Sequence, residues 1–265
     1  MNTVRDHLWL WGHQAGSHNG KFGLPADSRI TPTEAAHYLG IPNLIQVVFG
    51  GRPQPPFAQY APPMRSLSQV VWSIVGDASS ARTHQRPDLD EVLALVAPLP
   101  NLVGAIMDDF FHRSDPQGRI ARYSVEEVSG FRERLHQAAR PLDLWVVLYS
   151  HDLDLPVKDH LAVSDVVTFW TWECKSLAHL PENFARAEAL ASAARKVLGC
   201  YMWDYGANQP LPLERMAYQC ETGLQWLKEG RIQGMILLAS CVCDLGLEAV
   251  EWTREWIRRV GDQPL

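Results

Sequence analysis

Apolar segments recur eight times along the chain, and this repetition restricts its fold more than any other feature. They cover residues 7–13, 43–51, 69–77, 101–111, 142–152, 164–174, 196–206 and 234–244. The segments are rich in β-branched and aromatic residues, and most are continuous apolar runs rather than alternating ones. Such runs indicate strands that are covered on both faces, as in a parallel sheet.

The stretches between these segments carry helix start and stop signals. The clearest helix begins at Thr31, where Pro32 takes the first helical position and Glu34 completes a capping box. We predict four further helices, over residues 124–139, 180–197, 212–230 and 247–261. Residues 52–68 are rich in proline and predict a loop in place of a helix.

Strands and helices that alternate in this number predict a closed barrel. The 265 residues divided by eight give about 33 residues per unit, which suits one strand, one helix and their loops. Eight such units are typical of one barrel rather than of two open sheets. We therefore predict an α/β fold, a single (β/α)8 TIM barrel, with one domain over residues 1–265.

The charge and the aromatic content narrow the range of partners. The formal net charge is −6, which provides no basic surface for a nucleic acid or an anionic membrane, and we predict neither as a partner. The ten tryptophans fill a core or line a ligand pocket, because large rings are costly to expose. Trp9 and Trp11 lie deep in the first strand, and we expect them to pack in the core.

The cysteines and the N-terminal residues indicate the compartment. Five cysteines lie within apolar segments, with no C-x-x-C spacing that would suggest a metal knuckle. The N-terminal apolar stretch is too short for a secretory signal, and no segment approaches the ~18 apolar residues of a membrane helix. We predict reduced core cysteines in a cytoplasmic protein.

Polar and aromatic residues gather at the C-terminal ends of the predicted strands, where barrel enzymes build their active sites. The residues that we predict to form the site are His13, Gln14, Asn19, Asp108, Asp109, Tyr149, His151, Trp170, Trp172, Glu173, Trp203, Asp204 and Tyr205. Packing or capping would explain some of them equally well. His13 is as readily a core histidine, Trp170 and Trp172 are as readily core side chains, and an aspartate at a strand end often caps the next helix.

Carboxylates among aromatic rings suit the cleavage of glycosidic bonds. That reaction needs one acid that protonates the leaving oxygen and a second group that stabilises the oxocarbenium-like centre. Phe110 and Phe111 would raise the pKa of a neighbouring acid by disfavouring its charged form, and an adjacent carboxylate acts in the same direction. We predict Asp109 as the proton donor, with Glu173 or Asp204 as nucleophile or base. The substrate would be a small glycoside or oligosaccharide.

At three of these strand ends the chain resembles the O-GlcNAcase-type β-N-acetylglucosaminidases, which are glycoside hydrolase barrels. The adjacent aspartates in MDDFF match the pair that this family carries at the end of strand four. TFWTWEC and YMWDYGANQP are similar to its Trp-Thr and Trp-Asp-Asn motifs near strands six and seven. The resemblance implies a substrate-assisted mechanism. In it Asp108 orients the acetamido group that attacks the anomeric carbon, and Asp109 serves as general acid and then as general base.

The same residues are also compatible with two other functional classes. A metal-dependent hydrolase, isomerase or aldolase barrel would take its nitrogen and oxygen ligands from His13, Asp108 or Asp109, His151, Glu173 and Asp244. A non-catalytic sugar-binding barrel would need the aromatic residues but not the acids. The favoured glycosidase mechanism uses no cofactor and no metal ion, and a small carbohydrate is its expected partner. The sequence makes no prediction of the oligomeric state.

Overall fold

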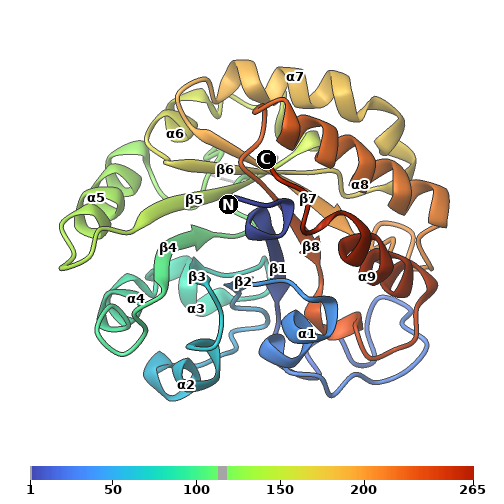
Figure 1. Cartoon of the computed structure of the whole chain (residues 1–265). Coiled ribbons are helices and arrows are strands. Elements are labelled where there is room, and N and C mark those ends of the chain that lie inside the picture. Colours follow the sequence, from blue (N-terminus) through green and yellow to red (C-terminus); the bar gives the residue numbers. More distant parts are fainter. Residues whose placement is uncertain (1, 113–117) are drawn as a thin grey trace. The chain divides into compact units, whose positions relative to one another are not determined.

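The computed structural model describes residues 2–112 and 118–265 of the chain (Figure 1). Eight strands pair in sequence order into a closed parallel barrel. They are β1 (Leu8–Gly12), β2 (Asn43–Gln46), β3 (Gln69–Val75), β4 (Leu102–Met107), β5 (Asp143–Tyr149), β6 (Val166–Trp170), β7 (Arg195–Tyr201) and β8 (Gly234–Leu238). The predicted (β/α)8 TIM barrel is confirmed.

Helices separate the strands along the chain. The α-helices are α1 (Pro32–Leu39), α2 (Ala61–Met64), α3 (Ala81–Gln85), α4 (Leu89–Ala94), α5 (Val125–His136), α6 (Lys158–Ala162), α7 (Leu180–Leu190), α8 (Leu213–Lys228) and α9 (Glu248–Val260). Short 3-10 turns also occur, namely η1 (Val4–His7), η2 (Phe57–Tyr60), η3 (Ser150–Asp152), η4 (Cys174–His179) and η5 (Ser240–Val242).

Capping residues start the helices where the sequence predicts them. The Thr31 hydroxyl accepts a hydrogen bond from the Glu34 backbone N–H, and the Glu34 carboxylate accepts one from the Thr31 N–H at 2.9 Å. Ser124 and Glu127 form the same reciprocal pair at the start of α5. Each pair satisfies backbone donors that a helix start leaves without an intrahelical acceptor.

Helix lengths differ from the prediction at two places. The predicted helix over 180–197 ends at Leu190, because the chain needs the following turn to begin β7 at Arg195. The proline-rich stretch 52–68 contains the two short pieces η2 and α2 rather than loop alone. The prolines of α2 stand at the start of the helix, where a missing N–H costs no hydrogen bond.

By internal contacts the described chain divides into two compact units. The terminal unit comprises the chain up to Gln46 together with Thr171–Leu180 and Val197–Leu265, and the central unit comprises Val47–Trp170 and Pro181–Lys196. In the terminal unit β1 pairs with β2 and β8, and β8 also pairs with β7. In the central unit β3, β4, β5 and β6 pair in that order.

The strands are covered on both faces, as their apolar runs predict. Every residue of β1, β2, β6 and β8 is buried, including Trp9 and Trp11 of β1. All five cysteines are unpaired; four are buried and Cys174 is partly exposed. Within the described residues, no helix has the length and the apolar character needed to span a membrane.

Candidate functional site

The aspartate pair lies at the C-terminal end of β4, in the central unit. Asp108 continues the strand ladder, because its backbone N–H donates to the Val75 carbonyl at 2.9 Å. Asp109 leaves the ladder, with a φ of 40° in the left-handed region that few residues other than glycine adopt. The strand has therefore turned into its loop between the two aspartates, so their carboxyl groups are not constrained to opposite faces of a strand.

The Asp108 carboxyl is buried, with 6% of the residue exposed. Burial raises its pKa well above the usual range, and the charges of Asp109 and Asp77 act in the same direction. A hydrogen bond from the Asp109 N–H to Oδ1 of Asp108, at 2.9 Å, offsets only part of this shift. The sequence predicts an acid with a raised pKa in this pair and assigns the acid role to Asp109; the raised pKa is found at Asp108.

Asp109 is partly exposed, and both of its carboxylate oxygens accept hydrogen bonds. The Tyr149 hydroxyl donates to Oδ1 at 2.9 Å, and the Ala78 backbone N–H donates to Oδ2 at 2.8 Å. The Arg122 side chain donates to the Asp109 carbonyl at 3.0 Å. These contacts hold the carboxylate in one orientation while solvent still reaches it.

Several of the predicted aromatic residues lie in the central unit with the pair. The ring of Tyr149 stacks on the exposed His151 imidazole at 5.0 Å, with an interplanar angle of 8°. Phe110 and Phe111 are buried as expected, and they pack edge to face against each other. Trp170 is fully buried and donates its indole N–H to the Thr168 hydroxyl at 2.8 Å, so its side chain fills the core.

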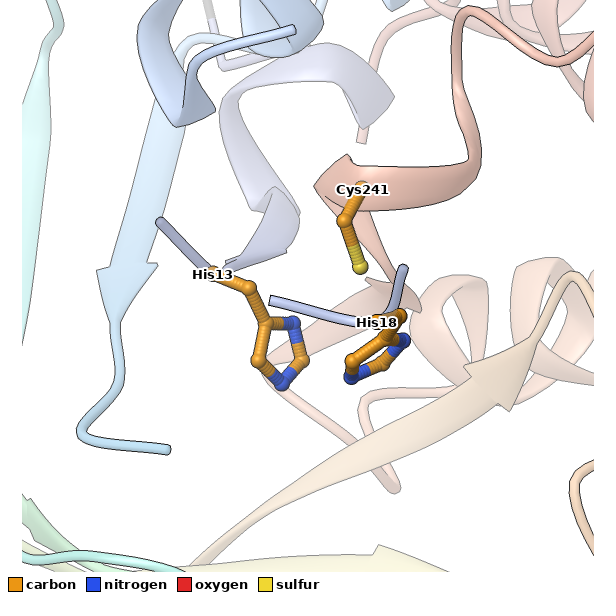
Figure 2. Close-up of side chains that lie close together, drawn as sticks. All are labelled: His13, His18 and Cys241. Atoms are coloured by element: carbon orange, nitrogen blue, oxygen red, sulfur yellow. The ribbon is translucent and has the colours of Figure 1, made fainter. Parts of the chain in front are cut away.

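In the terminal unit, three buried side chains with metal-binding donor atoms lie together (Figure 2). His13 follows β1, His18 lies in the loop after it, and Cys241 lies in η5 after β8. Their ligand atoms all lie within 4.8 Å of one another, and the two imidazole centroids are 4.3 Å apart. Burial, then the charges of His18 and Lys21, hold the pKa of His13 well below its usual range.

The sequence predicts only one member of this cluster as a site residue. It gives His13, leaves His18 in the same loop without a role, and interprets Cys241 as a core thiol. The available signal is two histidines five positions apart after strand one, together with a cysteine just after strand eight. The pairing of β1 with β8 brings these two strand ends side by side.

Aromatic residues predicted for the site line this cluster. The Tyr205 hydroxyl lies 3.3 Å from Nδ1 of His18, and the Tyr205 ring meets those of Phe22 and Trp172 at 5.1 and 6.0 Å. The Trp203 indole donates to the Phe22 carbonyl at 2.9 Å and is buried. Burial also raises the pKa of Tyr205 well above its usual range, so its hydroxyl keeps its proton at neutral pH.

The remaining predicted residues of the terminal unit make local contacts. The Glu173 side chain is 48% exposed and pairs with Lys175 at 3.2 Å. The buried Asp204 accepts a hydrogen bond from the Ala207 N–H at 3.2 Å within a turn. Asn19 bonds the backbone of Ser28 through both side-chain atoms, and the Gln14 carbonyl accepts a bond from Ser17.

A surface hollow of the central unit lies away from the aspartate pair. It is lined at the N-terminal ends of β3, β4 and β5 by Gln69, Leu102 and Asp143, with Arg140 beside them. The aspartate pair follows the opposite end of β4. Because barrel enzymes carry out their chemistry at the C-terminal ends of strands, we assign this hollow no role in the site.

Comparison with known proteins supports the fold. No family model and no curated protein sequence matches the chain. A candidate α-L-fucosidase from Bacteroides thetaiotaomicron is 10% identical, with a TM-score of 0.59 over 98% of this chain and 97% of the other. A GH113 β-mannanase from Alicyclobacillus acidocaldarius is 10% identical, with a TM-score of 0.57 over 98% and 99%. A GH18 chitinase from Cycas revoluta is 14% identical, with a TM-score of 0.58 over 94% and 99%.

The similar structures are mostly TIM-barrel glycoside hydrolases, at low sequence identity. Identity of this order shows a shared fold and does not transfer an activity. The matches support the barrel fold that the resemblance implies and add nothing specific to the O-GlcNAcase-type family.

Proposed function

We propose that this protein is a glycoside hydrolase in which the Asp108–Asp109 pair performs acid–base catalysis. The observation that carries the proposal is a buried carboxyl with a raised pKa beside a partly exposed, firmly oriented one. Two adjacent carboxyls in different environments are the arrangement that acid–base catalysis at a glycosidic oxygen requires. Their place after β4 is where barrel enzymes keep catalytic residues.

The different exposure of the two aspartates suggests a division of roles. Because the pKa of Asp108 is raised, the pair keeps a proton at a pH at which a lone carboxyl would have lost it. Asp109 is the member that solvent and substrate reach, and Tyr149 and Ala78 orient it. Asp109 would protonate the leaving oxygen as the glycosidic bond breaks, and would then take a proton from the water whose hydroxyl adds to the anomeric carbon.

The finer proposal is a substrate that carries an acetamido group. A substrate-assisted mechanism needs only one adjacent pair of carboxyls, because the acetamido oxygen of the substrate forms the bond to the anomeric carbon. Asp108 would orient that group and Asp109 would act as acid and base. The MDDFF motif and its position after the fourth strand support this reading.

Asp109→Asn tests the proposal. We expect kcat/KM on the best aryl glycoside to fall by about 100- to 10,000-fold, since general acid–base catalysis contributes that much. The melting temperature should stay near that of the wild type, because an amide oxygen can still accept from Tyr149 or Ala78. The substrate panel should include 4-nitrophenyl N-acetyl-β-glucosaminide beside glucosides, mannosides, fucosides and xylosides.

Asp143→Asn is the matched control. Asp143 lies at the N-terminal end of β5 and pairs with Arg195 at 2.6 Å, so the same substitution there should leave kcat/KM unchanged. If wild-type protein hydrolyses none of the glycosides, or if Asp109→Asn retains full activity, the proposal fails. Saturable sugar binding without turnover would favour the non-catalytic sugar-binding barrel instead.

A further inference from the structure

The cluster of His13, His18 and Cys241 has the composition of a transition-metal site. Imidazole nitrogen and thiolate sulfur are the donors that zinc prefers in proteins, and mixed cysteine–histidine sets are common around it. His13 and His18 are 4% and 3% exposed, and Cys241 is fully buried. Core packing alone gains little from two imidazoles and a thiol, because each carries polar atoms that must be withdrawn from water.

The three donor atoms are spaced almost as closely as the ligand atoms around a bound zinc ion. Ligand atoms around a tetrahedral zinc lie roughly 3.3–3.6 Å apart, from metal–ligand distances of about 2.0–2.3 Å. The donor atoms here lie within 4.8 Å of one another. Small side-chain rotations would therefore bring all three donors onto one ion. Figure 2 shows the Cys241 sulfur directed toward the two imidazole rings.

The backbone that carries the donors is fixed by side-chain contacts. The Ser240 hydroxyl accepts from the His13 N–H at 2.9 Å and lies 3.2 Å from the His13 carbonyl, to which it donates. Asp244, three residues after Cys241, accepts from the Arg29 and Ile30 N–H groups at 2.9 and 3.1 Å. These contacts tie the loop after β1 to the turn after β8, so two donors from the loop and one from the turn are held together before any ligand binds.

A neighbouring side chain orients His18. The Tyr205 hydroxyl oxygen lies 3.3 Å from Nδ1 of His18. If Nδ1 carries the hydrogen and donates to that oxygen, Nε2 becomes the ligand nitrogen. Metal-binding histidines usually have such an outer hydrogen bond on the second ring nitrogen, which fixes the tautomer and the ring plane.

We propose that His13, His18 and Cys241 bind one divalent transition-metal ion, and zinc is the ion that we expect. Binding converts the Cys241 thiol to a thiolate and releases its proton to solvent, so the ion carries two neutral imidazoles and one anionic sulfur. Three protein ligands fill three of the four positions of a tetrahedral zinc site. The proposal does not depend on the glycosidase proposal, and it departs from the sequence prediction that no metal is used.

Metal analysis of the purified full chain tests the site. Protein expressed in minimal medium with added zinc and dialysed against metal-free buffer should contain about one zinc per chain. Protein from medium in which cobalt replaces zinc should show a thiolate-to-cobalt charge-transfer band in the near ultraviolet. Cys241→Ser should abolish that band and weaken metal retention by at least about 100-fold, more than the loss of an outer-shell partner alone causes.

Cys243→Ser is the matched control. Cys243 is as buried as Cys241, lies two residues after it, and donates its thiol to the Ala239 carbonyl at 3.5 Å. This variant should keep both the metal and the band. His13→Gln supplies a second ligand variant in case Cys241→Ser does not fold, and it should also lose the metal. Wild-type protein with no stoichiometric metal and no band, or Cys241→Ser protein with unchanged metal content, overturns the proposal.

Discussion

At the scale of single residues, folding raises the pKa of the Asp108 carboxyl in the central unit well above its ordinary value. This carboxyl is withdrawn from water and lies near two other aspartates, Asp109 and Asp77. Each unit of difference between folded and unfolded pKa corresponds to about 1.4 kcal/mol of stability. The folded state therefore holds a proton that the unfolded chain releases at lower pH, and the pH dependence of stability reports this directly.

Asp108→Asn should change how stability depends on pH. The folded pKa of Asp108 is raised above its ordinary value of 3.8, so its penalty is absent below that pH and grows as pH rises toward the raised pKa. Asparagine imitates the protonated acid and still accepts the Asp109 N–H, but it never ionises. Urea unfolding of both proteins from pH 3.5 to 8 should show the variant gaining relative stability as pH rises. A difference that does not vary with pH would contradict the assignment.

Asp165→Asn, in the same unit, should change the pH dependence of stability in the opposite direction to Asp108→Asn. Burial alone would raise the pKa of Asp165, but hydrogen bonds from Arg132, the Leu144 N–H and His136 outweigh it and lower the pKa. A carboxyl group whose pKa is lowered by folding stabilises the folded state at pH values above its unfolded pKa. This contribution is lost as pH falls. The Asn variant should therefore be less stable than wild type at pH 7, and the difference should shrink toward pH 3.

Which site residues the sequence could predict depends on how locally their environment is set. The aspartate pair is predictable because an apolar strand and its end are visible in MDDFF itself. The difference between Asp108 and Asp109 is not, because Ala78 from the loop after β3 and Tyr149 from the end of β5 help to set it. The grouping of His13 with Cys241 depends on strands at the two ends of the sequence, so no local pattern reveals it.

At the scale of elements, the sequence predicts the strands and the capped helices well. Seven of the eight predicted apolar segments contain their strands completely, and β7 begins one residue before the seventh segment. The capping boxes at Thr31 and Ser124 form as expected. The short helices α3, α4 and α6 were not predicted. None of them has a capping side-chain hydrogen bond, and each is only five or six residues long. Tertiary packing rather than local sequence therefore determines them.

Gly104 in β4 tests how closely two neighbouring strands pack. A Cβ at this position would lie 2.9 Å from the Asp143 carbonyl and 2.8 Å from Nε1 of Trp145, and the carbonyl cannot move without disturbing the ladder. Gly104→Ala should therefore lower the free energy of unfolding by about 1–3 kcal/mol, the usual cost of overpacking. Urea denaturation measures it.

Gly130→Ala is the matched substitution with the opposite expected sign. Gly130 lies inside α5, and a Cβ there would meet nothing within 4 Å. Alanine should raise the free energy of unfolding by about 0.5–1 kcal/mol, because glycine is a poor residue for a helix interior. Equal effects of the two substitutions would show that backbone entropy, and not strand packing, decides both.

At the scale of the whole molecule, the order of elements determined the fold prediction more than any motif did. Alternating strands and helices with about 33 residues per unit leave few topologies, and sequential parallel pairing is the simplest. The closure itself is a long-range event. The pairing of β1 with β8 joins residues more than 220 positions apart, and nothing in either strand alone specifies its partner.

Arg5 offers a test of when long-range contacts form in the terminal unit. Its guanidinium donates to the Gly40 carbonyl at 2.8 Å and pairs with Asp262 at 3.0 Å, across 35 and 257 positions of sequence. Arg5→Ala should lower the free energy of unfolding by about 1–2 kcal/mol, since hydrogen bonds of charged groups contribute at that level.

The kinetics should show where on the folding pathway this contact forms. Contacts between distant residues form only after long loops have closed, so the loss should appear as unfolding about 5- to 30-fold faster with nearly unchanged folding. Arg258→Ala is the control, because Arg258 is 55% exposed and pairs with the nearby Glu255, and it should change stability by less than about 0.5 kcal/mol. Slower folding of Arg5→Ala at an unchanged unfolding rate would instead place closure of the barrel ends early, before the transition state.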